Sequence, residues 1–366
     1  MDTLEVEIFP DSLVPHVYQI YAGLYELHMA GRLRIVLSTH QVVPGDKHSL
    51  FVVVRDRARR KERKLCFDMG DGCRILPIQR LDACDLFFKR SFLQSIYESF
   101  PQAQRKKIVP FGLNWGATLR CGFVSKFRLA LASFRIGRLS PGYTNAPLGL
   151  AKELGKLFSS SSPFALLDRN HYLTADAFEA SAEEPASPRI IFQTRAWDHR
   201  SDPGDGPKFL ILNEQRANIV RALRRSFGDA FVGGMTPDEY SRKYYPDCLT
   251  PNSTDLASYL TIMKGCLIGV STIGLHGSTP WKLPEYLAAS RCIVMERLNY
   301  ALPVALEENL NFIPFQTADE CVQACQKLLS DPNLAMKMRL ANAQYYENEV
   351  RSAALLWRCL QTALNS

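Results

Sequence analysis

The sequence has no apolar run long enough to cross a bilayer. Its first ten residues, MDTLEVEIFP, are acidic and lack the charged-then-apolar pattern of a secretory signal, so we expect the protein in the cytoplasm. None of the ten cysteines forms a Cys-x-x-Cys pair, which leaves neither a zinc site nor a thioredoxin-type motif in the sequence. We expect the cysteines to be reduced and buried in the apolar segments that contain most of them.

The excess of one charge over the other is small. The chain has 44 lysines and arginines against 37 acidic residues, a net charge of +7. This balance favours an anionic ligand, or weak adhesion to an anionic membrane surface, and is too small to indicate nucleic acid as a partner. With 366 residues, of which 46% are hydrophobic and 22% charged, the chain is expected to form two globular domains.

Alternating strand-like and helix-like segments predict an α/β fold. Residues 1–158 form the predicted N-terminal domain, and residues 189–347 form the C-terminal domain, which opens with the strand RIIFQTR. Between them, residues 159–188 are rich in Ser, Pro and small residues, so they are predicted to be a linker. A final apolar-faced helix is expected within residues 348–366.

The most informative stretch is Gly265–Glu296. A short apolar strand (266–270) leads into a Gly-rich loop (271–279), then a helix that begins near Pro280 or Trp281, and a second strand (292–295). Two parallel strands need a crossover, so this order predicts a parallel βαβ unit, and such units bind ligands at the loop.

The composition of this loop suits a phosphate. Gly274 and Gly277 allow the backbone to approach a bound group closely. Ser278, Thr279 and Pro280 are typical residues of a helix start, where unpaired N–H groups and the helix dipole attract anions. We therefore expect Ser278 and Thr279 to contact phosphate through their hydroxyl and backbone groups.

Lys282 and Glu285 follow the loop at a spacing of three, which places them close together on the first helical turn. A cation there would hold a diphosphate, and a carboxylate would accept hydrogen bonds from a ribose diol. The alternative is an ordinary amphipathic helix with a Lys–Glu pair on its solvated face.

The order of these parts resembles the donor-binding segment of GT-B glycosyltransferases, especially the family-4-like sugar transferases and, more loosely, the exostosin-like ones. The resemblance continues through Asn309–Phe315, the Asp319–Glu320 pair and LLSDPNLAMKMRLANAQYY, so it covers about the last half of the chain. It implies two Rossmann-like domains facing a cleft, of which the first binds an acceptor and the second a nucleotide sugar. The final helix would pack back towards the N-terminal domain.

The resemblance also implies roles for residues of the C-terminal domain. Arg195, at the end of RIIFQTR, and Lys282 would neutralise the departing diphosphate, and Glu285 would bind the ribose. As the sugar leaves, the diphosphate gains negative charge, so preorganised cations lower the barrier. The alternative for Arg195 is an ion pair with Asp198 only.

One position departs from the family pattern. Family-4-like transferases usually have two glutamates that bracket seven residues; the second corresponds to Glu285, but Gly277 stands in place of the first, beside His276. His276 would contact the sugar instead, or be incidental, and the stereochemistry stays open. Because the sequence also has no Asp-x-Asp motif, we expect neither a metal nor another cofactor.

Three residues of the N-terminal half are candidates for handling an acceptor hydroxyl. His16 follows the first predicted strand, and Asp68 and Asp71 follow another, where a parallel sheet presents groups to a ligand. A helix cap or surface role is the alternative for His16, and a turn role is the alternative for an Asp beside Gly. Lys89 and Arg90 would bind an acceptor phosphate or pair with these carboxylates.

Two segments carry dense positive charge. Residues 55–64 (RDRARRKERK) follow the apolar segment 50–54, which is expected to be a strand inside a parallel sheet, and precede another predicted strand. They are interpreted as a solvated loop of mutually repelling charges. Residues 125–138 (SKFRLALASFRIGR) predict a helix that packs its apolar side inward; a membrane-surface helix is the alternative.

The leading hypothesis is therefore a metal-independent glycosyltransferase that transfers a sugar from a nucleotide sugar to a hydroxyl acceptor in glycan or polysaccharide synthesis. An epimerase of the same fold that acts on a nucleotide sugar is the first alternative. A catalytically degenerate scaffold that binds a partner is the second, because the first glutamate is missing.

Overall fold

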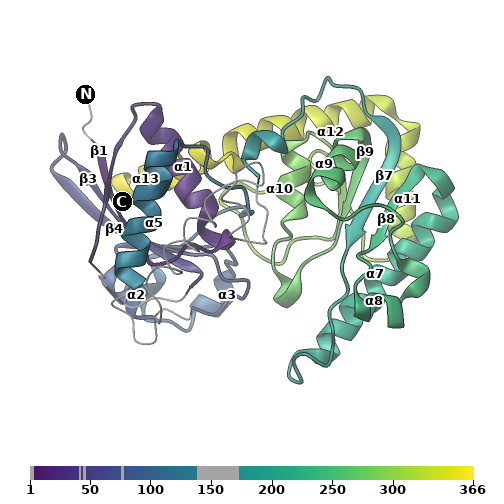
Figure 1. Cartoon of the computed structure of the whole chain (residues 1–366), viewed down its shortest axis with the longest axis horizontal. Coiled ribbons are helices and arrows are strands. Elements are labelled where there is room, and N and C mark those ends of the chain that lie inside the picture. Colours follow the sequence, from purple (N-terminus) through teal and green to yellow (C-terminus); the bar gives the residue numbers. More distant parts are fainter. Residues whose placement is uncertain (1–3, 41–42, 44–46, 76–77, 138–172) are drawn as a thin grey trace. The chain divides into compact units, whose positions relative to one another are not determined.

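Two sheets organise the chain, one in each of two compact units of the computed structural model, which describes residues 4–40, 43, 47–75, 78–137 and 173–366 (Figure 1). Unit 1 comprises Met1–Ala177, Asn299–Ala305 and Glu347–Ser366, and unit 2 comprises Phe178–Leu298 and Leu306–Tyr346. Part of the predicted linker, residues 159–172, lies outside the described residues. Its remainder from Phe178 onward belongs to unit 2.

The sheet of unit 1 has the strand order β2-β1-β3-β4-β5-β6. The strands are β1 (Leu4–Phe9), β2 (Arg34–Leu37), β3 (Ser49–Asp56), β4 (Lys61–Asp68), β5 (Leu86–Lys89) and β6 (Ile108–Pro110). Only β3 among them runs antiparallel to its neighbours. The carboxyl ends of the other five strands therefore lie along one edge of the sheet, where α/β folds present ligand-binding groups.

The antiparallel strand β3 corrects two expectations from the sequence. Residues 50–54 were expected inside a parallel sheet and residues 55–64 in a solvated loop, but β3 and β4 form an antiparallel hairpin that includes the whole basic run. A short turn can join two strands only when they are antiparallel, and residues 57–60 form that turn.

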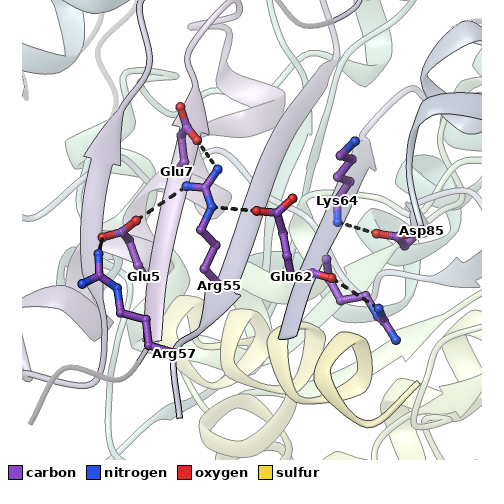
Figure 2. Close-up of polar contacts among 8 residues, drawn as sticks. Glu5, Glu7, Arg55, Arg57, Glu62, Lys64 and Asp85 are labelled. Carbon is purple, nitrogen blue, oxygen red and sulfur yellow. Dashed lines mark hydrogen bonds and ion pairs between the residues drawn. The ribbon is translucent and has the colours of Figure 1, made fainter. Parts of the chain in front are cut away.

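Acidic side chains of β1 and β4 pair with the basic ones of this hairpin (Figure 2). Arg55 donates to Glu62 and to Glu7, each at 2.8 Å, and Arg57 donates to Glu5 at 2.9 Å. Opposite charges on neighbouring strands attract, so these carboxylates offset part of the predicted mutual repulsion along this run.

Helices α1 (Tyr18–Met29) and α13 (Ser352–Asn365) pack against each other in the core of unit 1. Gly23 of α1 lies so close to α13 that an added Cβ would be 2.3 Å from the carbonyl oxygen of Ser352. The side chain of Gln19 donates to the carbonyl oxygen of Val350 at 2.9 Å. Other helices of this unit are α2 (Ile78–Ala83), α3 (Gln94–Tyr97), α4 (Gln102–Arg105) and α5 (Phe123–Gly137).

Helix α5 contains most of the segment for which a membrane-surface helix is an alternative; Arg138 lies outside the described residues. Lys126 is buried, whereas Arg128 and Arg135 are exposed, so only part of the positive charge faces solvent. Membrane-surface association stays a prediction. No helix in the described part of the chain combines the length and apolar character needed to cross a membrane.

The sheet of unit 2 has the order β11-β10-β9-β7-β8, and its described strand pairs are all parallel. The strands are β7 (Ser187–Thr194), β8 (Phe231–Met235), β9 (Cys266–Ser271), β10 (Cys292–Met295) and β11 (Ile313–Pro314). The helices are α7 (Gly206–Phe227), α8 (Glu239–Tyr244), α9 (Leu256–Gly265), α10 (Lys282–Ala288), α11 (Ala318–Ser330) and α12 (Pro332–Tyr345).

Both units thus combine a mainly or wholly parallel sheet with helices, which confirms the predicted α/β class with two Rossmann-like domains. The expected burial of the cysteines is confirmed for eight of the ten, whereas Cys73 and Cys121 are partly exposed.

Candidate functional site

The strand order of unit 2 defines where a ligand is expected. From β7 the chain crosses to β8 on one side, and later to β9 on the other, so the sheet has a switch point between β7 and β9. Ligands of open parallel sheets bind beyond the carboxyl ends of the strands at such a point. The residues that directly follow these ends are Arg195 after β7, Thr272 after β9 and Glu296 after β10.

Arg195 is an exposed cation at this switch point, and its guanidinium carbon lies 3.8 Å from the centroid of the Trp197 ring. The alternative partner suggested by the sequence, Asp198, pairs instead with Arg200 through bonds of 2.8 and 2.7 Å. Hydrogen bonds from Arg200 lower the pKa of the Asp198 carboxyl to about 2. The ion-pair partner of Asp198 is therefore Arg200.

Lys282 and Glu285 lie together at the start of α10, as the sequence predicts, with 3.6 Å between Nζ and Oε2. Tyr259 of α9 contacts both: its hydroxyl donates to Oε2 of Glu285 at 2.7 Å, and Nζ of Lys282 lies 3.7 Å from its ring centroid. This contact could not be predicted, because Tyr259 occupies one apolar position of an amphipathic helix. Both side chains are thereby held in place from a second helix.

Two other cations lie within electrostatic reach of Arg195 at this edge of unit 2. Burial lowers the pKa of Lys282; Glu285 opposes the shift, and the charge of Arg195 adds to it. Burial also lowers the pKa of Arg216 on α7 to about 10, again with a contribution from Arg195 and with Glu296 opposing. Arg195 is therefore close to both other cations, a charge arrangement that an anion would stabilise.

Glu296 is the second carboxylate of this region. It accepts hydrogen bonds from the backbone N–H of Ile273 at 2.9 Å and from the side chain of Gln215 at 2.7 Å. These bonds join the loops after β9 and β10 to α7. Both oxygens of its carboxylate are thus engaged by other parts of unit 2.

The Gly-rich loop differs from its prediction. Three of its N–H groups donate within the loop: Gly274 to the carbonyl of Ser278 at 2.8 Å, Gly277 to Gly274 at 3.2 Å, and Ser278 to Leu275 at 3.0 Å. His276 and Gly277 have φ values of 56° and 70°, and this left-handed pair turns the chain back on itself. These amides are therefore not the predicted phosphate cradle.

The predicted cap is also wrong. Helix α10 begins at Lys282, with Trp281 at the N-cap and no side-chain cap hydrogen bond, whereas Ser278 and Thr279 are buried in the preceding loop. Ser278 and Thr279 belong to the loop that turns before the helix starts, so neither occupies the N-cap position. His276 projects its Nε2 to 3.6 Å from Oδ2 of Asp205, near the start of α7.

The candidates of unit 1 lie at the carboxyl edge of its own sheet. Asp68 ends β4 and is buried; its Oδ2 is 2.9 Å from Nζ of Lys89, at the end of β5, and its Oδ1 accepts from the N–H of Gly70 at 2.9 Å. Both carboxylate oxygens are thus engaged, one in a turn and one in an ion pair, as the sequence alternatives for this residue proposed.

Asp71 and His16 are more accessible. Arg90 donates to Asp71 at 2.5 Å, and the ring of His16 lies 4.5 Å from that of His48, a residue that the sequence did not single out. Burial lowers the pKa of His16 to about 4; Asp71 opposes the shift and Arg90 adds to it. His16 is therefore a neutral imidazole near pH 7, although the lowered pKa also makes it a weaker base than an ordinary histidine.

The lowered pKa of His16 predicts a pH dependence of folding. Between about pH 4 and 6.5 the unfolded chain binds the proton and the folded chain does not, so the free energy of unfolding falls as the pH falls through this window. Replacing His16 by Asn should reduce this loss by up to about 3 kcal/mol. Urea titrations at pH 7 and pH 4.5 measure it; equal losses in both proteins would contradict the assignment.

Within the described residues, no three His, Cys, Asp or Glu side chains gather in a way that would hold a metal ion.

No protein-family model matches the chain, and no curated protein matches it. Among solved structures, it is similar to the C-terminal domain of a glycosyl transferase group 1 family protein from Francisella tularensis (12% identity, TM-score 0.33, 48% of this chain and 96% of that one). It is also similar to UDP-GlcNAc 2-epimerase from Neisseria meningitidis bound to UDP-GlcNAc (12% identity, TM-score 0.37, 78% of this chain and 64% of that one). A third likeness is to sucrose-phosphate synthase from Thermosynechococcus elongatus (11% identity, TM-score 0.36, 76% of this chain and 88% of that one). All three are distant, and the chain spans just under two thirds of the epimerase.

Proposed function

We propose that the protein is a metal-independent glycosyltransferase that moves a sugar from a nucleotide sugar to a hydroxyl acceptor. One observation carries the proposal: at the switch point of the unit 2 sheet, Arg195 lies within electrostatic reach of both Lys282 and Arg216. Like charges gathered at a ligand-binding edge suit a ligand with two adjacent negative groups, such as a diphosphate.

In this proposal Arg195 and Lys282 bind the diphosphate, and Glu285 accepts a hydrogen bond from the ribose. Tyr259 already holds Oε2 of Glu285 and the ammonium of Lys282, so neither side chain has to be ordered when the donor binds. The cations then stabilise the charge that develops on the diphosphate as the sugar leaves. Ser278 and Thr279 lie buried in the loop that precedes α10, and their contact with the phosphates stays a prediction.

For the acceptor, unit 1 offers His16 as the base that takes the hydroxyl proton. Its lowered pKa keeps the imidazole unprotonated near neutral pH. Asp68 is a poorer base, because Lys89 and Gly70 already occupy its oxygens. Asp71 remains paired with Arg90 and would act by keeping that cation near His16.

Calorimetric titration of the protein with UDP, GDP and ADP, in EDTA, tests the donor site. At least one diphosphate should bind, whereas the corresponding nucleoside should bind far more weakly, because most of the favourable interaction is with the phosphates. If no diphosphate binds, or if nucleoside and diphosphate bind equally, the proposal is wrong. Incubating the protein with the matching nucleotide sugar then separates a transferase, which needs an acceptor, from an epimerase, which does not.

A further inference from the structure

The loop that carries Arg195 is held by two residues of α7, Asn213 and Arg216. Asn213 is fully buried and bonds both backbone polar groups of Trp197: Nδ2 donates to the carbonyl at 2.8 Å, and Oδ1 accepts from the N–H at 2.9 Å. The two α7 residues are three positions apart, so they lie on the same side of the helix. Through Asn213, the helix fixes the backbone two residues after Arg195.

Arg216 fixes the backbone of Arg195 itself. Its Nη1 donates to the carbonyl oxygen of Arg195 at 2.8 Å, and its Nε donates to Oγ1 of Thr272 at 3.2 Å. Arg195 follows β7 and Thr272 follows β9, the two strands on either side of the switch point. A single planar guanidinium therefore joins both strand ends, which the single ammonium group of lysine is less suited to do.

The side chain of Arg195 depends on this backbone. Its guanidinium lies on the ring of Trp197, and that ring in turn contacts Phe209 of α7, with 5.9 Å between ring centroids. Trp197 is the residue whose backbone Asn213 holds. Helix α7 thus contacts both the backbone and the ring of Trp197, on which the guanidinium of Arg195 lies.

Packing alone gives no reason for an arginine at position 216. Only 7% of its surface is exposed, and burying a guanidinium is unfavourable unless it is well bonded. The positive charge of Arg195 makes this burial less favourable still. The bonds that offset this cost go to Thr272 and to the carbonyl oxygen of Arg195, and they connect the role of Arg216 with Arg195.

We infer that Asn213 and Arg216 are positioning residues, which hold Arg195 in the orientation that receives the diphosphate. The inference rests on the proposed function, and it adds that these two residues act through Arg195 and not by contact with the ligand.

A double-mutant cycle tests this. Replacing Arg216 by Met should weaken UDP binding by about tenfold in the otherwise unchanged protein, comparable to losing one charge-assisted contact. In an Arg195→Ala background, the same replacement should change the affinity less than twofold. Arg221→Met, which removes an exposed ion pair with Asp247 further along α7, is the matched control and should leave UDP binding unchanged in both backgrounds. Equal losses from Arg216→Met in both backgrounds, or no loss in either, would overturn the inference.

The fluorescence emission of Trp197 provides a second measurement, which needs no ligand. It is obtained as the difference in emission between each protein and its Trp197→Phe counterpart. Arg216→Met and Arg216→Lys should both change this emission, because neither replacement has a planar fork for the two strand ends. Arg221→Met should not. If the protein binds no diphosphate but Arg216→Met alters the Trp197 emission, the proposed function fails and the positioning of the loop stands. If this emission is unchanged, the positioning itself is refuted.

Discussion

Replacing Lys282 by Met is expected to lower the turnover of the sugar donor by about 100- to 1000-fold, the usual effect of removing one preorganised group that stabilises developing charge. Its ammonium lies 3.6 Å from Glu285 and rests on the ring of Tyr259, so its position is fixed before the donor binds. The loss should appear mainly in kcat, because the negative charge on the diphosphate grows as the sugar leaves. Release of nucleoside diphosphate in the presence of an acceptor measures it.

Two further variants separate this effect from a general loss of positive charge. Lys208→Met removes an exposed α7 cation that pairs with Asp205, and it should leave kcat within about twofold of the original. Glu285→Gln keeps the shape of the side chain but removes its charge; it should raise KM for the donor more than it lowers kcat, because the ribose stays bound throughout the reaction. A Lys282→Met protein with unchanged kcat would exclude Lys282 from the leaving-group site.

The positions of Arg195, Lys282 and Glu285 could be predicted because they depend on local order along the chain. Arg195 follows an apolar strand, and the other two begin a crossover helix, so the geometry of a parallel sheet brings them to the same edge. The contacts that fix them could not be predicted. Tyr259 and Glu285 are 26 residues apart, and Arg216 and Thr272 are 56 apart; only the packed structure brings each pair together.

The Gly-rich loop was misjudged for a different reason. Its composition allows either a phosphate cradle or a closed turn, and the choice depends on the backbone angles of two residues. His276 adopts a positive φ, which is uncommon for a residue with a Cβ, and this directs the loop amides onto loop carbonyls. The orientation of β3 was missed because a strand rich in valine suits a central position of either kind of sheet.

Replacing Gly23 by Ala is expected to destabilise unit 1 by about 3 kcal/mol or more, at the upper end of the cost of overpacking a core. The added Cβ would meet the Ser352 carbonyl oxygen at 2.3 Å and its carbon at 2.7 Å. These are backbone atoms of α13, which cannot rotate away as a flexible side chain would. Relief requires α13 to move away from α1, and this loosens a core that includes Leu355, Leu356 and Leu360.

Urea denaturation of the full chain measures this effect. Because the chain has four tryptophans, the signal of Trp357 on α13 is taken as the difference in fluorescence between each protein and its Trp357→Phe counterpart. Gly265→Ala is the control: it also adds a methyl group to a helix, but no atom lies within 4 Å of the new Cβ, so the unfolding midpoint should stay the same or rise slightly. Leu356→Ala removes the next nearest contact, its Cγ at 2.9 Å, and should not rescue Gly23→Ala, because the clash with the Ser352 backbone remains. A rescue would show that side chains set the distance between α1 and α13. Equal midpoints for the two glycine variants would show that α13 is not packed tightly against Gly23.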